Sequence, residues 1–234
     1  MNAHLTKFTA IVFGIVLVTN AHYATAQVEN AEDQIKFARF VVGDKWTFRY
    51  KDRIDGMEQG GIASREVVEI DGDYAWTLFK SSSRPEPVWE KFDLKLRFLV
   101  ERRAYSESTP SKRGEVTFDN TKSDPLIQHP LSVGKSYKAK IIFSNKFGNG
   151  YIDYTANVEA LEKIKVEAGE FEVYKIVLKG RWVNTSAGGS DLSERTEWYA
   201  PRAKVTVRSE LNSWSQGRVN PYNTFELSEI KLVR

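Results

Sequence analysis

Residues 152–166, Ile-Asp-Tyr-Thr-Ala-Asn-Val-Glu-Ala-Leu-Glu-Lys-Ile-Lys-Val, alternate between apolar and polar side chains along almost their whole length. Successive side chains of a β-strand point to opposite sides, so this stretch predicts one long strand with a single apolar face. Glu162 is the one carboxylate on that face. The apolar face carries Ile152, Tyr154, Ala156, Val158, Ala160, Ile164 and Val166.

The same period of two recurs along the rest of the chain. Residues 90–98 alternate cleanly, with Phe92, Leu94, Leu96 and Phe98 on one face, and they predict a strand of firmly set register. About ten such runs, at intervals of roughly 10–14 residues and with almost no helical period, predict an all-β fold. We expect an antiparallel barrel or half-open barrel, because closure removes the unpaired edges of a large sheet.

Residues 105–132 lose this alternation. The segment contains three prolines together with many small polar side chains, and it predicts a long connection with one short strand near Val116–Phe118. Structureless connections of this length are uncommon inside a domain, so we expect part of it to lie against the sheet.

Two short segments, far apart in the chain, resemble each other. Val42-Gly43-Asp44-Lys45-Trp46 and Val133-Gly134-Lys135-Ser136-Tyr137 each open a series of strands. This similarity suggests two related halves, at roughly 40–104 and 130–234, although similarity by chance over so short a stretch is an open alternative.

Residues 1–26 have the features of a cleavable signal peptide. Lys7 is their only formally charged side chain, and it precedes an apolar run, residues 8–18, that is too short to span a bilayer. Ala24 and Ala26 supply the small side chains that signal peptidase requires, so cleavage is expected before Gln27. We therefore expect a single β-rich domain, residues 27–234, in the periplasm or secreted from a Gram-negative type of envelope. An uncleaved anchor is the weaker alternative.

Composition excludes several classes of function. Loss of Lys7 with the leader lowers the formal net charge from +3 to +2, without the concentrated basic charge of a nucleic-acid-binding protein. The absence of cysteine excludes a thiol nucleophile, a CxxC redox pair and a thiolate metal site. We predict no cofactor, no metal, no nucleic-acid partner and no transmembrane span after cleavage.

Three motifs in the second half together resemble a known fold family. They are residues 130–137 (Pro-Leu-Ser-Val-Gly-Lys-Ser-Tyr), residues 166–176 with Ala168-Gly169-Glu170 near their start, and Trp198-Tyr199-Ala200-Pro201. In this order they resemble exported bacterial β-barrel-like domains of unknown function with a YmcC-like fold. The resemblance implies a lipocalin-like or half-open barrel in the cell envelope and carries no catalytic residues. That family usually has a glycine soon after the last motif, where this chain has Arg202, Ala203 and Lys204.

Few side chains are candidates for chemistry. His129 is the only histidine after the leader, and we interpret it as a solvated loop residue. Glu90 and Glu162 share the parity of apolar neighbours, which is costly for a carboxylate without a partner. Either Glu90 lies at a strand end in water and a bulge at Glu162 changes the register, or one or both point into a cavity and orient a ligand. An acid–base pair is the remaining alternative.

Tryptophans and arginines give two weaker signals. Most of the six tryptophans are expected to pack within the sheet, but Trp182 and Trp198 lie near strand ends beside loops and are candidates for ligand binding. The basic residues Arg102, Arg103, Lys112 and Arg113 are interspersed with glutamates and are interpreted as a solvated face.

Three functions follow from this sequence. The first is a non-enzymatic envelope protein that binds a hydrophobic or glycan ligand, or a partner protein, in or on its sheet. The second is a carboxylate-dependent hydrolase of an envelope glycan. The third is an interaction module that pairs an exposed sheet edge with a partner strand.

Overall fold

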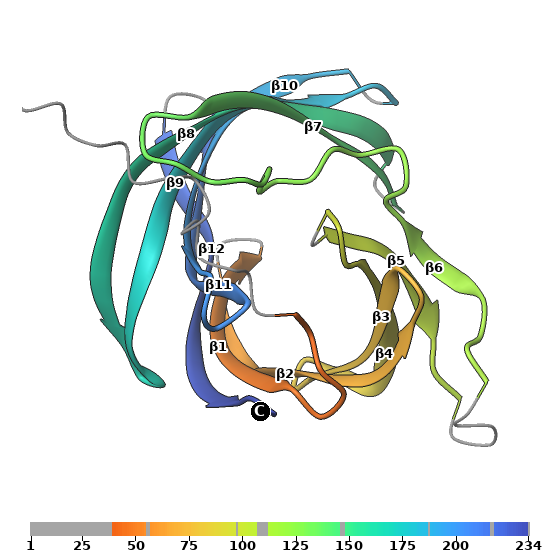
Figure 1. Ribbon diagram of the computed structural model, residues 1–234. Coiled ribbons are helices and arrows are strands. Elements are labelled where there is room, and N and C mark those ends of the chain that lie inside the picture. The colour runs from red at the N-terminus through yellow and green to blue at the C-terminus, as the bar shows by residue number, and fades with distance from the viewer. Residues whose placement is uncertain are drawn as a thin grey trace, which may run out of the picture. The chain divides into compact units, whose positions relative to one another are not determined.

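The computed structural model describes residues 39–54, 57–96, 98–106, 112–145, 148–186, 188–215 and 218–233. The predicted leader and its cleavage site, Ala24, Ala26 and Gln27, lie outside these residues. The described residues form twelve strands and no helix (Figure 1). The strands are β1 (Lys45–Ile54), β2 (Met57–Asp71), β3 (Tyr74–Ser81), β4 (Arg84–Asp93), β5 (Phe98–Ala104), β6 (Val116–Asp119), β7 (Ser136–Asn145), β8 (Gly148–Val166), β9 (Gly169–Asn184), β10 (Ser190–Ala200), β11 (Val205–Ser215) and β12 (Arg218–Lys231).

All twelve strands belong to one curled antiparallel sheet. Its order is β6-β5-β4-β3-β2-β1-β12-β11-β10-β9-β8-β7, so every neighbour in the sheet is a neighbour in the chain except β1 and β12. The first and last strands therefore join the two halves, and β6 and β7 are the two edges. The predicted all-β, antiparallel class is confirmed. Of the two predicted forms, a barrel or a half-open barrel, the curled and unclosed sheet is compatible with the half-open one, and it has twelve strands in place of about ten.

The prediction of one strand over residues 90–98 is wrong. β4 ends at Asp93, and residues 94–96 form a turn before β5 begins at Phe98. Asp93 Oδ1 accepts hydrogen bonds from the backbone N–H groups of Lys95 and Leu96, each at 2.8 Å. Such a side-chain bond to the backbone a few positions ahead turns the chain. Leu96, expected on the apolar face, is half exposed as a result.

The long strand predicted at residues 152–166 is confirmed as part of β8. Its register against β9 shifts between Val158 and Ala160, so the strand contains a bulge, but the bulge precedes Glu162, where it was expected. Beyond this bulge the β8–β9 hairpin reaches across to β12, where the Ala168 N–H donates to the Leu227 carbonyl at 3.2 Å. A bulge thus lets one hairpin pair within the sheet and also pack its tip against another strand.

Each half of the sheet opens with the same glycine turn. Gly43 and Gly134 have φ angles of +94° and +86°, in the region that side chains rarely adopt. The Gly43 N–H donates to the Val67 carbonyl at 2.8 Å, and the Gly134 N–H donates to the Val158 carbonyl at 2.9 Å. Each glycine is separated from its partner by the same length of chain, so the sequence similarity reflects a repeated local structure.

The bulges repeat as well. The register of β2 against β3 shifts after Val67, and the register of β8 against β9 shifts after Val158. A second pair of shifts follows Lys91 in β4 and Trp198 in β10, again at matching positions of the two halves. The two halves, β1–β6 and β7–β12, are therefore similar in strand order and in the positions of these two pairs of register shifts.

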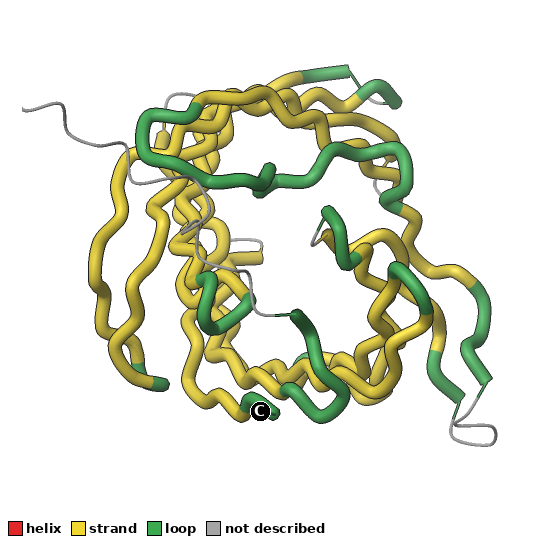
Figure 2. The backbone as a smooth tube through the Cα atoms, in the orientation of Figure 1, coloured by secondary structure: helices red, strands yellow, loops and turns green. Residues whose placement is uncertain are grey.

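Residues 120–135, which we call the strap, connect the two edge strands. The Asp124 N–H donates to the Lys140 carbonyl at 2.8 Å, and Asp124 Oδ2 accepts the Lys140 N–H at 2.9 Å. Ser123 Oγ accepts the Ile142 N–H at 2.8 Å. The strap thus covers the free edge of β7 (Figure 2), which confirms that the predicted connection lies against the sheet.

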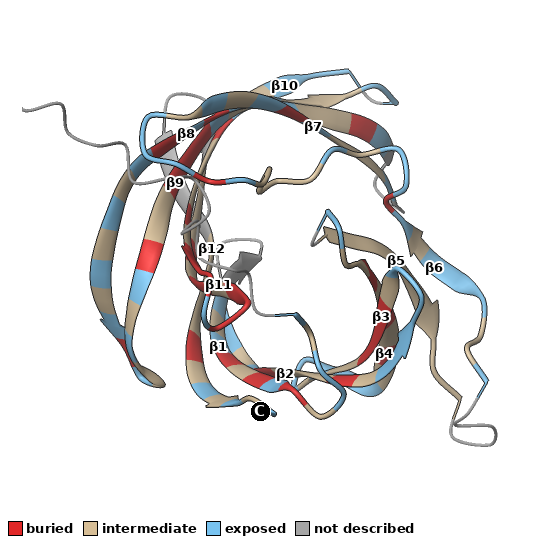
Figure 3. Ribbon diagram, viewed as in Figure 1, coloured by how far each residue is buried: buried red, intermediate tan, exposed pale blue. Residues whose placement is uncertain are grey.

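Buried apolar side chains form two clusters. Figure 3 colours the buried residues of the strands red. The larger cluster joins both halves through Trp46 and Leu227, and its members come from strands on either side of the β1–β12 pair. The smaller one packs Leu126, Ile127 and Leu131 of the strap against β7–β10. Within the described ranges, no helix is long and apolar enough to cross a membrane.

Candidate functional site

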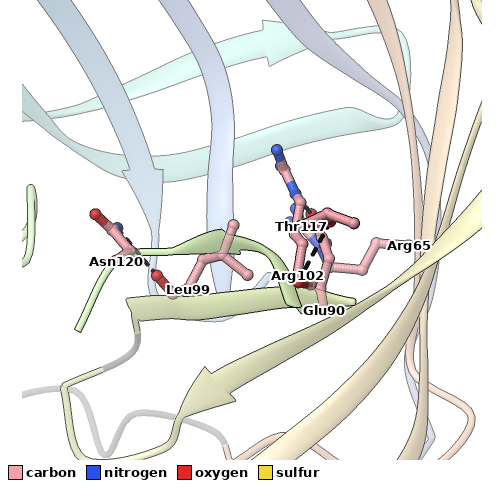
Figure 4. Close-up of polar contacts among 6 residues, drawn as sticks. All are labelled: Arg65, Glu90, Leu99, Arg102, Thr117 and Asn120. Atoms are coloured by element: carbon pink, nitrogen blue, oxygen red, sulfur yellow. Dashed lines mark hydrogen bonds and ion pairs between the residues drawn. The ribbon is translucent and has the colours of Figure 1, made fainter. Parts of the chain in front are cut away.

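Three charged side chains from three strands meet on the inner face of the first half. Glu90 of β4 is completely buried, and each of its oxygens accepts a hydrogen bond. Arg65 Nε of β2 donates to Oε2 at 2.6 Å, and Arg102 Nε of β5 donates to Oε1 at 2.8 Å (Figure 4). Arg102 is the direct register partner of Glu90. We call Arg65 and Arg102 the arginine pair.

Glu90 stays ionised because of these two partners. Burial is the largest single influence on its pKa and raises it, but the charges and hydrogen bonds of Arg65 and Arg102 together outweigh burial. The pKa of Glu90 therefore lies below its ordinary value. A carboxyl group in this state is a poor proton donor near neutral pH.

Aromatic rings hold both guanidinium groups. The Arg65 guanidinium carbon lies 4.7 Å from the centre of the Phe92 ring, and that of Arg102 lies 5.5 Å from the centre of the Phe118 ring. Both also lie within 5.8 Å of the centre of the Phe79 ring. These cation–π contacts, together with the Glu90 hydrogen bonds through Nε, fix each guanidinium without using its terminal nitrogens.

The arginine pair lines two adjoining cavities inside the curl. The main cavity has a volume of about 430 Å³, and the side cavity has a volume of about 410 Å³. Phe48, Arg65, Arg102 and Phe225 line both. The walls of the main cavity are otherwise mostly apolar, and several of its side chains belong to the strap: Asn120, Pro125, Leu126, Ile127 and His129.

A second ion pair lines the main cavity from the second half of the sheet. Arg195 Nε donates to Glu197 Oε1, which also accepts a hydrogen bond from Ser209 Oγ at 3.0 Å. Burial lowers the pKa of Arg195, but the charge of Glu197 and its hydrogen bond outweigh burial, and the net shift is upward. Arg195 and Glu197 are of opposite formal charge, so this pair adds no net formal charge to the cavity wall.

Lys204 and Asp44 form a third, buried pair. Lys204 Nζ donates to Asp44 Oδ2 at 2.5 Å, and Asp44 also accepts the N–H groups of Val41 and Val233. Lys204 has a φ angle of +67°, a conformation that favours glycine. It is one of the three residues that stand where the resembling family usually has a glycine, and its ion pair to Asp44 accompanies the unusual backbone.

The four side chains predicted to bind a ligand are placed at three separate positions. Glu90 lies with the arginine pair, so its interpretation as a solvated strand end is wrong. Trp198 Nε1 donates to Glu162 Oε1 at 3.0 Å, which joins those two residues to each other. Trp182 stacks on Phe143, with ring centres 5.7 Å apart and an interplanar angle of 3°. Neither tryptophan lines the main or the side cavity.

Two other interpretations need correction. Arg102 and Arg113 are not on a solvated face, because their side chains are only 31% and 25% exposed and form ion pairs with Glu90 and Glu69. His129 is not a solvated loop residue, because it is half buried with its ring centre 5.3 Å from that of Tyr199. Arg65 was not identified from the sequence at all. A signal for it existed, since it shares the parity of Ala63 and Val67, both of which are buried.

The remaining surface depressions and side-chain clusters provide weaker candidates for a functional site. A depression of about 510 Å³ on the outer face of β1, β2, β11 and β12 is lined by exposed side chains such as Arg49 and Lys51 and by half-buried ones such as Arg208 and Glu226. Among the described residues, no group of three histidine, aspartate or glutamate side chains is placed to hold a metal ion.

Solved structures share this fold. A candidate exported protein with a YmcC-like fold from Bacteroides fragilis superposes with a TM-score of 0.51 at 14% identity, over 83% of this chain and 98% of the other. A candidate lipoprotein from Parabacteroides distasonis gives 0.48 at 16% identity, over 83% and 98%. The hypothetical lipoprotein YmcC of Escherichia coli gives 0.43 at 13% identity, over 80% and 86%. No family model and no curated protein sequence matches this chain. The similarity to the B. fragilis structure shows that this chain has the YmcC-like fold.

Proposed function

We propose that this chain is an exported, non-enzymatic binding protein that holds one hydrophobic ligand inside its curled sheet. The observation that carries this proposal is the pair of adjoining cavities of about 430 and 410 Å³. Small-molecule sites are typically mostly apolar cavities of about 300–1,000 Å³ with a few placed polar groups. The similar B. fragilis protein is described as an exported protein, which supports a location in the envelope.

The apolar walls favour a hydrophobic ligand over a glycan. The main cavity is bounded by phenylalanines from several strands and by aliphatic side chains of the strap. Most of the charged side chains in its wall form ion pairs with one another or with a neighbouring residue, as Arg195 does with Glu197. A glycan needs many free donors and acceptors around its hydroxyl groups, because polar groups that lose water without a new partner weaken binding.

Two alternatives receive less support. A hydrolase would use Glu90 or Glu197 as an acid, yet the pKa of Glu90 is lowered and Glu197 is bonded to Arg195 and Ser209. An edge-pairing module would need a long bare edge strand. The strap covers β7, and the other edge strand, β6, spans only Val116–Asp119.

The test is native mass spectrometry of the protein purified from its own envelope. We expect a bound lipid mass that is lost from Ile127→Trp, because the larger ring would fill the main cavity that Ile127 lines. Ile62→Trp is the control, since Ile62 is 48% exposed and lies outside the two cavities. Protein that never carries a lipid, and binds none when hexadecanol or hexadecanoate is added, would contradict the proposal.

The location has its own test. If the leader is cleaved as expected, the mature protein begins at Gln27 and is released with the periplasmic or secreted fraction. Intact mass measurement after fractionation decides this, and recovery of the full-length chain from the cytosol would overturn it.

A further inference from the structure

We propose that the ligand is an anionic amphiphile, with its carboxylate or phosphate head on the arginine pair and its alkyl chain along the phenylalanine walls. This inference rests on the proposed function, since it concerns the same cavities. It goes further by specifying the charge of the ligand and the two side chains that bind its charged head.

The first step is the surplus of positive charge at the arginine pair. Two guanidinium groups share the single carboxylate of Glu90, so this group carries one net positive charge. The other two ion pairs at the main cavity, Arg195 with Glu197 and Lys204 with Asp44, are each neutral. In the main cavity the surplus therefore lies at Arg65 and Arg102, and the side cavity adds the exposed Arg84 to its lining.

The second step is the position of the remaining donors. Each arginine meets Glu90 through Nε, so that carboxylate leaves the terminal nitrogens of both guanidinium groups unused. The side chains of Arg65 and Arg102 are 18% and 31% exposed, and both line the main and the side cavity. Terminal guanidinium nitrogens in this position suit a planar carboxylate or a phosphate, which accept paired N–H bonds.

The third step concerns the apolar side chains that surround the arginine pair. Phe79, Phe92 and Phe118 pack against the guanidinium groups, so the charge lies in a largely apolar wall. A charge in such surroundings attracts an opposite charge more strongly than it would in water. The same rings, with Phe48 and Phe225 at the junction of the two cavities, give an alkyl chain an apolar surface next to the head.

The test compares ligands of one chain length with different heads. Wild-type protein is titrated with hexadecanoate, hexadecanol, hexadecyltrimethylammonium and hexadecyl phosphate. We expect the anions to bind at least about tenfold more tightly than the alcohol, the factor that corresponds to about 1.4 kcal/mol, and the cation to bind most weakly. Tighter binding of hexadecanoate than of hexadecyl phosphate would identify a free fatty acid as the source, and the reverse order would identify a phospholipid head.

The matched variants are Arg102→Gln and Arg103→Gln. Arg102→Gln leaves a neutral Arg65–Glu90 pair, so it should abolish the preference for the two anions over hexadecanol, measured as the ratio of their affinities in the same variant. Arg103 is the next residue of β5, but it is paired to Glu101 and lies over Trp76, so its variant should keep the preference. If Arg102→Gln does not fold, the head-group series on the wild type still decides the question.

The outcomes separate the two proposals. Equal binding of hexadecanoate and hexadecanol by the wild type would overturn the anion inference and leave the hydrophobic site standing. Binding of none of the four would overturn both. A preference for anions that survives Arg102→Gln would show that the head is read elsewhere and would also overturn this inference.

Discussion

Glu90 and Glu197 occupy equivalent positions in the two halves of the sheet. Each lies on the fourth strand of its half, is buried, and pairs in register with the fifth strand, at Arg102 and Ser209 respectively. The sequence separation between the two glutamates equals the separation between their two register partners. The halves differ in the number of arginines that pair with the carboxylate, because Glu90 has two arginine partners and Glu197 has one. The excess charge at the main cavity therefore comes from this single difference.

Replacing Glu90 should destabilise the protein. Glu90→Gln leaves two partly buried guanidinium groups side by side without a counter-charge, and we expect the free energy of unfolding to fall by about 2–4 kcal/mol. Urea denaturation followed by tryptophan fluorescence measures this. Glu167→Gln is the control, since it removes an exposed ion pair with Arg49 and should leave the midpoint unchanged. Equal midpoints for the two variants would contradict the buried pairing.

The contribution of Glu90 should depend on pH in one direction. Its pKa in the folded protein lies below the ordinary value of 4.5, so the folded state binds this proton less readily than the unfolded state. The stabilisation is present above pH 4.5 and is lost as the pH falls through the lower, folded value. Urea midpoints of wild type and Glu90→Gln should differ equally at about pH 7 and about pH 5.5 and converge at more acidic pH. A difference that grows on acidification would be inconsistent with the lowered pKa.

Lys204→Gly should be destabilising, although glycine suits the backbone at this position. Glycine removes the strain of the +67° φ angle but leaves Asp44, which is fully buried, without its cation. We expect a net loss of about 2–4 kcal/mol. A double-mutant cycle with Asp44→Asn should give a coupling energy above about 1 kcal/mol. A Lys204→Gly protein more stable than the wild type would mean that the backbone strain is the larger effect.

Uncovering the edge of β7 should promote self-association. Ser123→Ala with Asp124→Ala removes side-chain acceptors of the Ile142 and Lys140 N–H groups, and about 1–3 kcal/mol of stability should be lost. Exposed strand edges also pair with other chains. Light scattering during prolonged warm incubation measures this, with the exposed neighbour Lys122→Ala as the control. Equal scattering from both proteins would show that the two side chains do not protect the edge.

The alternation of side chains predicts the strands well, but it does not identify turns made by single side chains. Residues 90–98 keep perfect alternation across a turn, because Asp93 reverses the chain through its own carboxylate and needs no glycine or proline. The repeated Val-Gly openings were a true signal, since both glycines adopt the same rare backbone conformation.

The candidate site was visible in the sequence only in part. Glu90 is conspicuous as a carboxylate with the parity of apolar neighbours, but its partners are distant in the sequence and lie on other strands. Only the pairing of strands brings Arg65 and Arg102 to it. The predicted ligand-binding role of Trp182 and Trp198 rests on their position near loops. The walls of the two cavities come instead from strand interiors and the strap. Their predicted role in ligand binding stays a prediction.

The strap performs two tasks with the same few residues, since it bounds the main cavity and also satisfies the backbone of β7. If a guest molecule passes between the strap and β7, it must first detach Ser123, Asp124 and Gln128 from that strand. Loading by this route would then be slow and would briefly expose bare backbone amides. Ligand entry by this route would thus carry a risk of aggregation. High protein concentration would increase this risk, and a bound ligand would reduce it.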